Sequence, residues 1–130
     1  NDSMPLRALV ADDEALFRDQ VRTLLEERGV EVLEAVDGHE AFALFIREDV
    51  QLMVTDFLMP RIDGIQLVRD IRMTGAKGRI PVVLMSAISK GHVIQGPKDL
   101  GPDHYINKPF KPKKMGKLLD KIIKELKAAS

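Results

Sequence analysis

The segment that decides the fold is residues 52–64, which read LMVTDFLMPRIDG. Its apolar beginning runs directly into Asp56, and Pro60 and Gly64 mark its exit. A short apolar run between turn residues is typical of a buried strand in a parallel sheet. Asp56 then lies at the carboxyl end of that strand, where open α/β sheets place their chemistry. Taken alone, Asp56 is a turn-former, a metal ligand or a nucleophile, and the preference of aspartate for turns favours the first.

Short apolar runs alternate with helical patterns on both sides of this segment. In addition to the central strand, strands are predicted at residues 6–11, 30–36, 80–85 and 104–107. Apolar residues recur with helical spacing over residues 15–28, 41–45, 65–71 and 115–126. Gly29 is the expected C-cap of the first helix. Five strands alternating with helices predict a parallel sheet that is covered on both faces.

The expected fourth helix is the weakest element of this pattern. Gly91, Gly96 and Pro97 interrupt it, and a proline costs about 3 kcal/mol inside a helix. We therefore predict that residues 89–98 form a short, distorted or mobile fourth helix.

The composition of the 130-residue chain fits one globular domain with a real core. Its 20 basic and 20 acidic residues cancel, so we expect no direct binding to nucleic acid or to a membrane. The lysines between residues 111 and 127 are interpreted as a solvated helix face. The chain has no cysteine, which excludes disulfides and thiolate chemistry and fits a cytoplasmic protein. No apolar run approaches the roughly 20 residues of a membrane span.

The first residue of the chain is Asn1, not methionine. Residues 1–3 are therefore either a remnant ahead of a natural start at Met4 or the cut end of a longer chain. In both cases we expect a single domain over residues 4–128.

Acidic, hydroxyl and amino side chains follow four of the predicted strands. In chain order they are Asp12 and Asp13, then Asp56, then Ser86, then Lys108. In a flavodoxin-like strand order, 2-1-3-4-5, the first and third strands are neighbours about 4.8 Å apart, so their terminal carboxylates converge. Carboxylates about 4 Å apart repel by roughly 4 kcal/mol at an effective dielectric constant of 20. A shared proton or a hard divalent ion such as Mg²⁺ would relieve that repulsion.

Each of these residues also has an ordinary structural interpretation. The pair Asp12-Asp13 is a competent N-cap for the following helix. Ser86 alone is more often the start of a helix than a reactive hydroxyl, and Lys108 alone is a solvated lysine. These interpretations do not explain why all of these residues follow strand ends.

Over residues 6–127 the chain resembles the receiver domain of response regulators in two-component signalling. The residues that carry the resemblance are Asp12-Asp13, D-x-x-M-P at residues 56–60 with Asp63-Gly64, Ser86-Ala87, and Tyr105 with Lys108-Pro109-Phe110. Each motif is weak by itself, whereas their order and spacing together are specific. The resemblance implies an α/β, flavodoxin-like, doubly wound five-stranded parallel sheet with five helices. One departure is Gly101-Pro102, where the family usually has Gly-Ala.

The resemblance implies that Asp56 is a phosphoacceptor, which takes a phosphoryl group from a histidine kinase or a histidine phosphotransfer protein. The implied ion is Mg²⁺, with Asp13, Asp56 and the backbone carbonyl of Leu58 as ligands and Asp12 acting largely through water. Catalysis of such a transfer is mainly positioning and charge neutralisation.

The resemblance also implies residues that assist the transfer and residues that change conformation after it. The Lys108 ammonium and the Ser86 hydroxyl are implied to pair with phosphoryl oxygens, and the Lys108-Pro109 peptide bond to be cis. Ser86 and Tyr105 are the implied switch, in which the hydroxyl moves to the phosphoryl group and the ring turns inward to repack the output face. The alternative for Tyr105 is static packing on an edge strand. The output partner stays open, and a phosphorylation-dependent homodimer is one expected assembly.

Two apolar residues bear on the lifetime of the phosphoryl group. Leu58 and Ile88 lie two residues after Asp56 and Ser86, where the family tunes the access of water to the site. Both are apolar, so we expect slow self-dephosphorylation. The alternative is that both side chains merely pack.

Other functions compete with this interpretation. A phosphatase of the haloacid dehalogenase type also uses a strand-end aspartate and Mg²⁺, but needs a second aspartate where this chain has Leu58. A receiver-like interaction module without phosphorylation would not need the complete acceptor set. A flavodoxin-like cofactor binder needs a glycine-rich phosphate loop, which does not follow the first strand. We therefore expect not an ordinary enzyme but a phosphoacceptor that catalyses its own phosphorylation and slow dephosphorylation.

Overall fold

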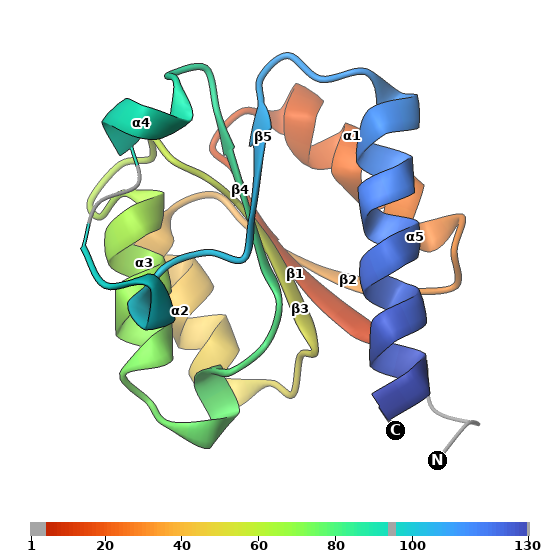
Figure 1. Cartoon of the computed structure of the whole chain (residues 1–130), viewed down its shortest axis with the longest axis horizontal. Coiled ribbons are helices and arrows are strands. Elements are labelled where there is room, and N and C mark those ends of the chain that lie inside the picture. The colour runs from red at the N-terminus through yellow and green to blue at the C-terminus, as the bar shows by residue number, and fades with distance from the viewer. Residues whose placement is uncertain (1–4, 94–95, 130) are drawn as a thin grey trace.

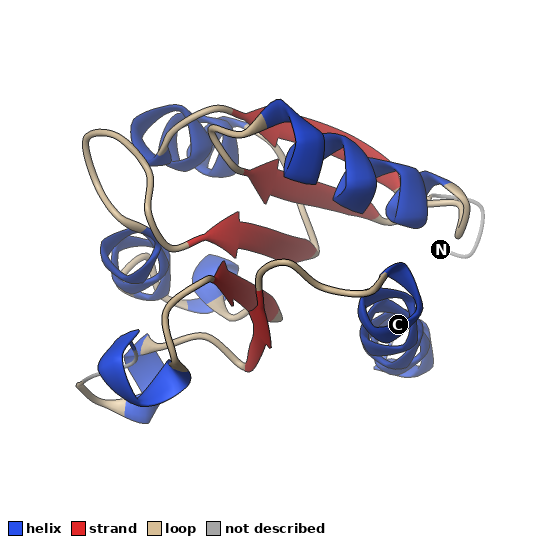
Figure 2. Ribbon diagram, turned by 90° about the horizontal axis from the view of Figure 1, so that it is seen from above, coloured by secondary structure: helices blue, strands red, loops and turns tan. Residues whose placement is uncertain are grey.

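The computed structural model describes residues 5–93 and 96–129. Its parallel strands form one sheet in the order β2-β1-β3-β4-β5, and Figure 1 and Figure 2 show this sheet between two layers of helices. The predicted flavodoxin-like fold and its strand order are confirmed. The strands are β1 (Arg7–Ala11), β2 (Glu31–Ala35), β3 (Leu52–Asp56), β4 (Val82–Ser86) and β5 (His104–Asn107).

The α-helices connect the strands and cover both faces of the sheet. They are α1 (Ala15–Glu26), α2 (Gly38–Arg47), α3 (Gly64–Arg72), α4 (Lys90–Val93) and α5 (Pro112–Ala129), with short 3₁₀ turns η1 (Ala76–Gly78) and η2 (Lys98–Leu100). Figure 1 shows α1 and α5 on one face of the sheet, and α2 and α3 on the other. In the described part of the chain, no helix combines the length and the apolar character that a membrane span requires.

The sheet is buried on both faces because its central strands carry apolar residues at successive positions. Ala8 and Val10 of β1 belong to the core beneath α1 and α5, whereas Leu9 belongs to the core beneath α2 and α3. Successive side chains of a strand point to opposite faces, which explains this alternation. The buried residues of α5 are Met115, Gly116, Leu119, Ile122 and Ile123. The two cores together fix the sheet, and hence the positions of the strand ends.

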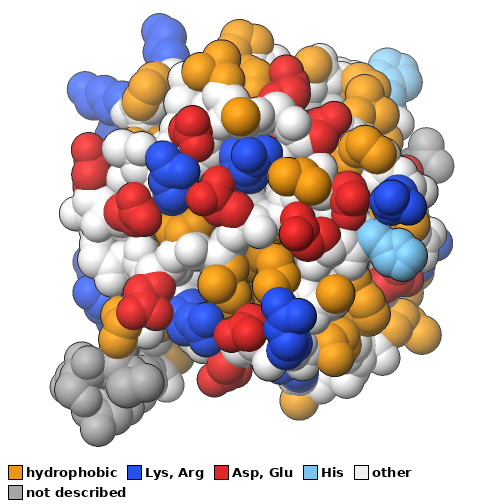
Figure 3. All heavy atoms as spheres, turned by 180° about the vertical axis from the view of Figure 1, so that it is seen from behind, with side chains coloured by type: hydrophobic (Ala, Val, Ile, Leu, Met, Phe, Trp, Pro, Cys, Tyr) orange, Lys and Arg blue, Asp and Glu red, His pale blue; other side chains and the backbone are white. Residues whose placement is uncertain are grey.

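Charged side chains are paired locally on the surface. On the face seen in Figure 3, acidic and basic side chains are intermixed. Arg7 lies 3.0 Å from Glu48, and Arg18 lies 3.0 Å from Glu34. Such partly exposed pairs contribute only about 0–1 kcal/mol each. These surface ion pairs therefore add little to the stability of the fold.

The α4 segment is the irregular element that the sequence predicts. Its described residues form a short helix, Lys90–Val93. Gly96 then has a positive φ of 92°, and Pro97 has extended backbone angles. Both conformations end an α-helix. Shortness and distortion are therefore confirmed for the described residues, whereas residues 94–95 lie outside them and mobility stays a prediction.

Aspartates begin two of the helices, and a glycine follows the end of another. The Asp37 carboxylate accepts a hydrogen bond from the Glu40 N–H at 2.7 Å, and the Asp63 carboxylate accepts one from the Gln66 N–H at 2.8 Å. Both are N-caps, at α2 and α3. Gly29 follows α1 with a φ of 78°, a left-handed conformation that glycine adopts without strain.

Gly64 sets how closely α3 approaches the end of β3. The Gly64 N–H donates to the Phe57 carbonyl at 2.7 Å. A Cβ atom on Gly64 would collide with the Asp56 carbonyl oxygen and would lie 2.9 Å from a methyl group of Leu84. No side chain fits between the helix start and the strand end, so glycine is required there.

We expect Gly64→Ala to lower the free energy of unfolding by about 1–3 kcal/mol, because the added methyl group meets backbone that cannot move aside. Gly91→Ala is the matched control, since a Cβ atom on Gly91 meets nothing within 4 Å. Urea denaturation of the two variants measures the difference. Equal stability would contradict this close approach of α3 to β3.

Candidate functional site

The carboxyl ends of β1 and β3 bring two buried carboxylates together. In the parallel ladder Ala11 pairs with Thr55, so Asp12 after β1 and Asp56 at the end of β3 are neighbours. Asp12 is fully buried and Asp56 is 5% exposed. The Glu14 N–H donates to Asp12 Oδ1 at 2.9 Å and holds that carboxylate in place. The two acids thus meet as the strand order requires.

Lys108 completes the site from the end of β5. Its backbone N–H donates to the Ser86 carbonyl at 2.9 Å, and its peptide bond to Pro109 is cis, the isomer that the resemblance implies. The Lys108 Nζ lies 3.0 Å from Asp12 Oδ2 and 3.2 Å from Asp56 Oδ2. The Lys108 side chain is only 6% exposed. A buried cation therefore lies between the two buried acids.

Two exposed acids extend the buried pair to a cluster. A carboxylate oxygen from each of Asp12, Asp13, Glu14 and Asp56 lies within 4.8 Å of the others. Asp13 and Glu14 are exposed to solvent. Mg²⁺ takes a few carboxylates together with water and phosphate oxygens, and this set offers both buried donors and an open side. The residues present therefore fit a hard divalent ion.

The acid pair is not the N-cap of α1. The N-cap residue of that helix is Glu14, whose side chain makes no capping hydrogen bond. The Asp12 carboxylate instead receives the Glu14 N–H inside the turn that leaves β1. The N-cap interpretation of Asp12-Asp13 is therefore wrong, and both carboxylates belong to the acid cluster.

Burial and like charge control protonation in the site. Burial and the neighbouring Asp12 charge raise the pKa of Asp56 to about 6, although Lys108 opposes the shift. Burial also raises the pKa of Asp12, against the Glu14 N–H and Lys108. Burial lowers the pKa of Lys108, but its hydrogen bonds to Glu14 and Asp12 outweigh burial and leave that pKa raised. Lys108 therefore stays charged, while Asp56 holds a proton more tightly than an ordinary aspartate.

The two implied switch residues meet at the backbone of Ile88. Ser86 is 1% exposed, and its Oγ accepts a hydrogen bond from the Ile88 N–H at 2.9 Å. The Tyr105 hydroxyl donates to the Ile88 carbonyl. Both side chains are thus tied to the same residue after β4, and neither can move without releasing it.

The site borders a cavity of about 380 Å³ at the carboxyl end of the sheet. Its polar lining includes Asp13, Asp56 and Lys108, and Leu58 contributes an apolar side. Leu58 is 59% exposed and Ile88 is 36% exposed. Both side chains are therefore open to solvent, and their effect on the access of water to the site stays a prediction.

The sequence alone does not identify Glu14 and Phe17 as members of the site. The Glu14 carboxylate lies 2.9 Å from Lys108 Nζ, and the Phe17 ring centroid lies 4.2 Å from the same nitrogen. The helical pattern places Phe17 only among the core residues. A signal was present, because two residues three apart at a helix start share one face, and this helix follows directly on a strand end.

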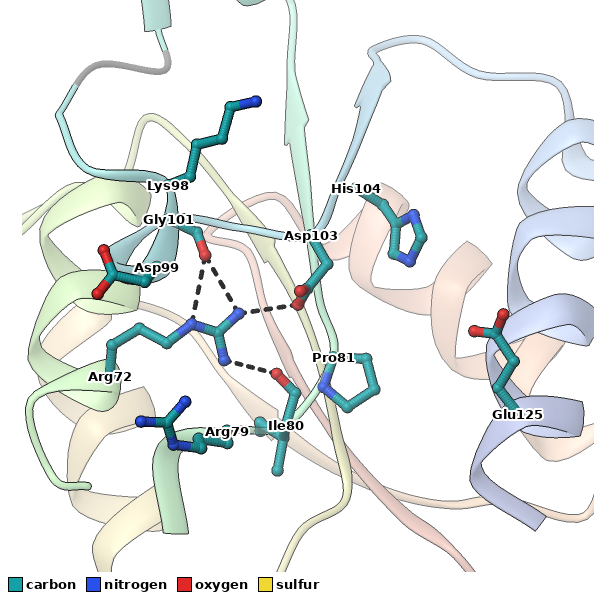
Figure 4. A pocket seen from close by; sticks show the side chains of 10 residues that line it. All are labelled: Arg72, Arg79, Ile80, Pro81, Lys98, Asp99, Gly101, Asp103, His104 and Glu125. Carbon is teal, nitrogen blue, oxygen red and sulfur yellow. Dashed lines mark hydrogen bonds and ion pairs between the residues drawn. The ribbon is translucent and has the colours of Figure 1, made fainter. Parts of the chain in front are cut away.

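A second cavity, of about 400 Å³, lies at the opposite end of the sheet. Figure 4 shows Arg72 in its wall, directed toward Gly101 and Asp103. Arg72 Nη2 donates to the Gly101 carbonyl at 3.1 Å and to Asp103 Oδ2 at 2.8 Å. This guanidinium is thus engaged in holding the chain that enters β5. The cavity at the carboxyl end is therefore the better candidate for chemistry.

Comparison with known protein sequences places the chain among signalling regulators. The model of the response regulator receiver domain matches residues 8–120. The probable transcriptional regulator ycf27 of Porphyridium aerugineum is 34% identical over 124 residues, which are 95% of this chain and 50% of that protein. The transcriptional regulatory protein PdtaR of Mycobacterium tuberculosis is 37% identical over 109 residues, which are 83% of this chain and 52% of that protein. The chain thus spans about half the length of these relatives.

Solved structures show the same fold. The chemotaxis protein CheY4 of Vibrio cholerae superposes with a TM-score of 0.83 at 27% identity, covering 92% of this chain and 99% of that chain. The receiver domain of the Francisella response regulator 1452 superposes with a TM-score of 0.81 at 32% identity, covering 93% of this chain and 98% of that chain. The matched range, residues 8–120, spans the strand ends that carry the site. The chain therefore belongs to the response regulator receiver domains of two-component signalling.

Proposed function

We propose that this chain is a phosphoacceptor receiver domain, which takes a phosphoryl group onto Asp56 from a histidine kinase or a histidine phosphotransfer protein. The observation that carries the proposal is the buried Asp56 carboxylate, 3.2 Å from Lys108 Nζ and beside a cavity of about 380 Å³. Asp12, Asp13 and Glu14 place further carboxylates around it. Membership of the receiver family supports this role.

In the proposed transfer, an Asp56 carboxylate oxygen forms a bond to the donor phosphorus while the bond from phosphorus to the donor histidine breaks. The histidine nitrogen leaves with the electron pair of that bond. The Lys108 ammonium and the Ser86 hydroxyl are the proposed partners of the transferring oxygens, whose negative charge they stabilise. Because the pKa of Asp56 is raised only to about 6, its carboxylate is ionised at neutral pH, as a nucleophile must be.

A Mg²⁺ ion is the proposed cofactor, since the donor set of the acid cluster fits it. The proposed ligands are Asp13, Asp56 and the backbone carbonyl of Leu58, with Asp12 acting largely through water. When bound, the ion supplies positive charge that neutralises the acids and the phosphoryl oxygens. Lys108 alone cannot balance the acids once a phosphoryl group is added, which is why the site needs a second cation.

The proposed output switch is the pair Ser86 and Tyr105. To reach a phosphoryl oxygen, the Ser86 Oγ must release the Ile88 N–H, and an inward turn of Tyr105 must release the Ile88 carbonyl. These changes bias a two-state repacking of the face formed by α4, β5 and α5. Phosphorylation-dependent homodimerisation through this face is part of the proposal. The short α4 gives an output partner a different surface from that of a regular fourth helix.

The proposed phosphoryl group is long-lived. Leu58 lines the cavity, Ile88 is partly exposed two residues after Ser86, and neither side chain offers a polar group to a hydrolytic water. Leu58 also argues against a phosphatase with a second acid at its position. We therefore propose that the protein is a phosphoacceptor rather than an enzyme that turns over a free substrate. Its proposed location is the cytoplasm.

Acetyl phosphate tests the proposal without the cognate kinase. With Mg²⁺ present, intact-mass spectrometry should detect one phosphoryl group per chain, and EDTA should prevent its uptake. After acetyl phosphate is removed, the loss of the phosphoryl group from the protein measures its lifetime. Rapid loss would contradict slow self-dephosphorylation but not the phosphoacceptor role. Failure of both acetyl phosphate and phosphoramidate to modify the protein would favour a receiver-like interaction module that works without phosphorylation.

A further inference from the structure

Glu14 and Phe17, at the start of α1, both contact the Lys108 ammonium. The Glu14 carboxylate lies 2.9 Å from Lys108 Nζ, as close as the 3.0 Å of the buried Asp12 carboxylate. The Phe17 ring lies over the same nitrogen, with its centroid 4.2 Å away. Such a cation–π contact is favourable by about 0.5–2 kcal/mol. The ammonium is therefore held by groups outside the acids and the hydroxyl that were expected to form the site.

The Lys108 ammonium already donates hydrogen bonds to Asp12 and Glu14 and forms an ion pair with Asp56. An ammonium group has three N–H donors, and its carboxylate neighbours Asp12, Glu14 and Asp56 lie 3.0, 2.9 and 3.2 Å from Nζ. Phosphorylation of Asp56 would add anionic oxygens that need the same donors. The phosphoryl oxygens must therefore compete with Asp12 and Glu14 for the Lys108 ammonium.

Glu14 is the neighbour that Lys108 can release at the lowest cost. Asp56 loses its own carboxylate charge when the acyl phosphate forms, so Asp12 and Glu14 are the two neighbours that keep theirs. The Asp12 side chain is 0% exposed, so Asp12 would remain as a buried, unpaired charge. The Glu14 side chain is 58% exposed, and water can replace Lys108 as its partner. The exchange of partners therefore takes place at Glu14.

We propose that Glu14 is a positioning residue that competes with the phosphoryl group for the Lys108 ammonium and thereby slows phosphorylation of Asp56. This inference rests on the proposed phosphoacceptor function. Before transfer, Glu14 engages one N–H of Lys108. During transfer that N–H passes to a phosphoryl oxygen, while the Phe17 ring stays beside the ammonium. The Glu14 charge also repels the incoming donor phosphate, which acts in the same direction.

Glu14→Gln tests the proposal because it keeps the shape of the side chain and removes its charge. With saturating Mg²⁺, acetyl phosphate should phosphorylate the variant about three- to fivefold faster than the wild type. The difference should shrink at high salt, since the exposed charge is screened. An unchanged or slower rate would overturn the proposal, because it would make Glu14 a neutral contact or an anchor that Lys108 needs.

Glu125→Gln is the matched control. It makes the same change of charge on the exposed side of α5, at the cavity on the opposite end of the sheet (Figure 4). We expect its phosphorylation rate to equal that of the wild type. An equal acceleration in both variants would overturn the proposal, since a general change of net charge would then explain the effect.

The side-chain ¹⁵Nζ resonance of Lys108 in the metal-free, unphosphorylated protein gives a second, independent measurement. Glu14→Gln should shift this resonance and speed the exchange of its protons with water, whereas Glu125→Gln should leave it unchanged. An unaltered resonance in Glu14→Gln would overturn the proposal even if the rates differ. If the wild type accepts no phosphoryl group, the proposed function itself is overturned. If the wild type is phosphorylated and Glu14→Gln is phosphorylated at the same rate, only this inference is overturned.

Discussion

Asp56→Asn is expected to abolish phosphorylation of the protein. An amide is not a nucleophile of the kind that a carboxylate provides, and the neighbouring acids are poorly placed to replace it. Asp12 is fully buried against Lys108, and Glu14 is exposed on the outer side of the same ammonium. With acetyl phosphate and Mg²⁺, intact-mass spectrometry should detect the phosphoryl group on the wild type and none on Asp56→Asn.

Loss of uptake in Asp56→Asn should not reflect unfolding. The pKa of Asp56 is raised from 3.8 to about 6 in the fold, so its ionisation costs stability as the pH rises through that window. Removing the charge should therefore leave the variant at least as stable as the wild type at neutral pH, which thermal unfolding in EDTA measures. Asp99→Asn, at the opposite cavity, is the control and should be phosphorylated normally. A phosphoryl group on Asp56→Asn would place the acceptor on another residue.

The sheet and the strand-end acids are predictable from local sequence because parallel strands bring their carboxyl ends to one edge. An apolar run followed by Asp12, and another that ends in Asp56, are sufficient to place two carboxylates side by side once the strand order is assumed. The interruption of α4 is predictable for the same reason, since glycine and proline act on the backbone where they stand.

The partners of Lys108 are less predictable, because they depend on where distant segments meet. Glu14 is 94 positions away from Lys108 along the chain, and its carboxylate reaches the ammonium only because α1 begins beside the end of β1. Phe17 follows the helical spacing of the core, so the helical pattern alone does not distinguish its contact with a charge from ordinary packing. The link of Ser86 and Tyr105 through Ile88 likewise arises from the path of the loop after β4.

Lys108→Met is expected to lower the free energy of unfolding of the metal-free protein by about 3 kcal/mol at neutral pH. Methionine keeps the length of the side chain but leaves Asp12 and Asp56 without the cation between them. Both acids are almost completely buried, so water cannot replace it. Urea denaturation measures the loss, and Lys98→Met, an exposed lysine at the opposite cavity, is the control that should change stability little.

The pH dependence of that loss distinguishes lost charge pairing from lost packing. Lys108 lowers the pKa of both Asp12 and Asp56, so its removal raises two pKa values that burial already holds above the ordinary value. A carboxylate whose pKa is raised in the fold binds a proton more tightly when folded, and stability then increases as the pH falls. The deficit of Lys108→Met should therefore be largest above pH 6, the pKa of Asp56, and should diminish toward about pH 4 as the acids are protonated. Added Mg²⁺ should also reduce the deficit, since it supplies the missing positive charge. An equal deficit across this range, insensitive to Mg²⁺, would mean that Lys108 stabilises the fold through its contact with Phe17 rather than by balancing the acids.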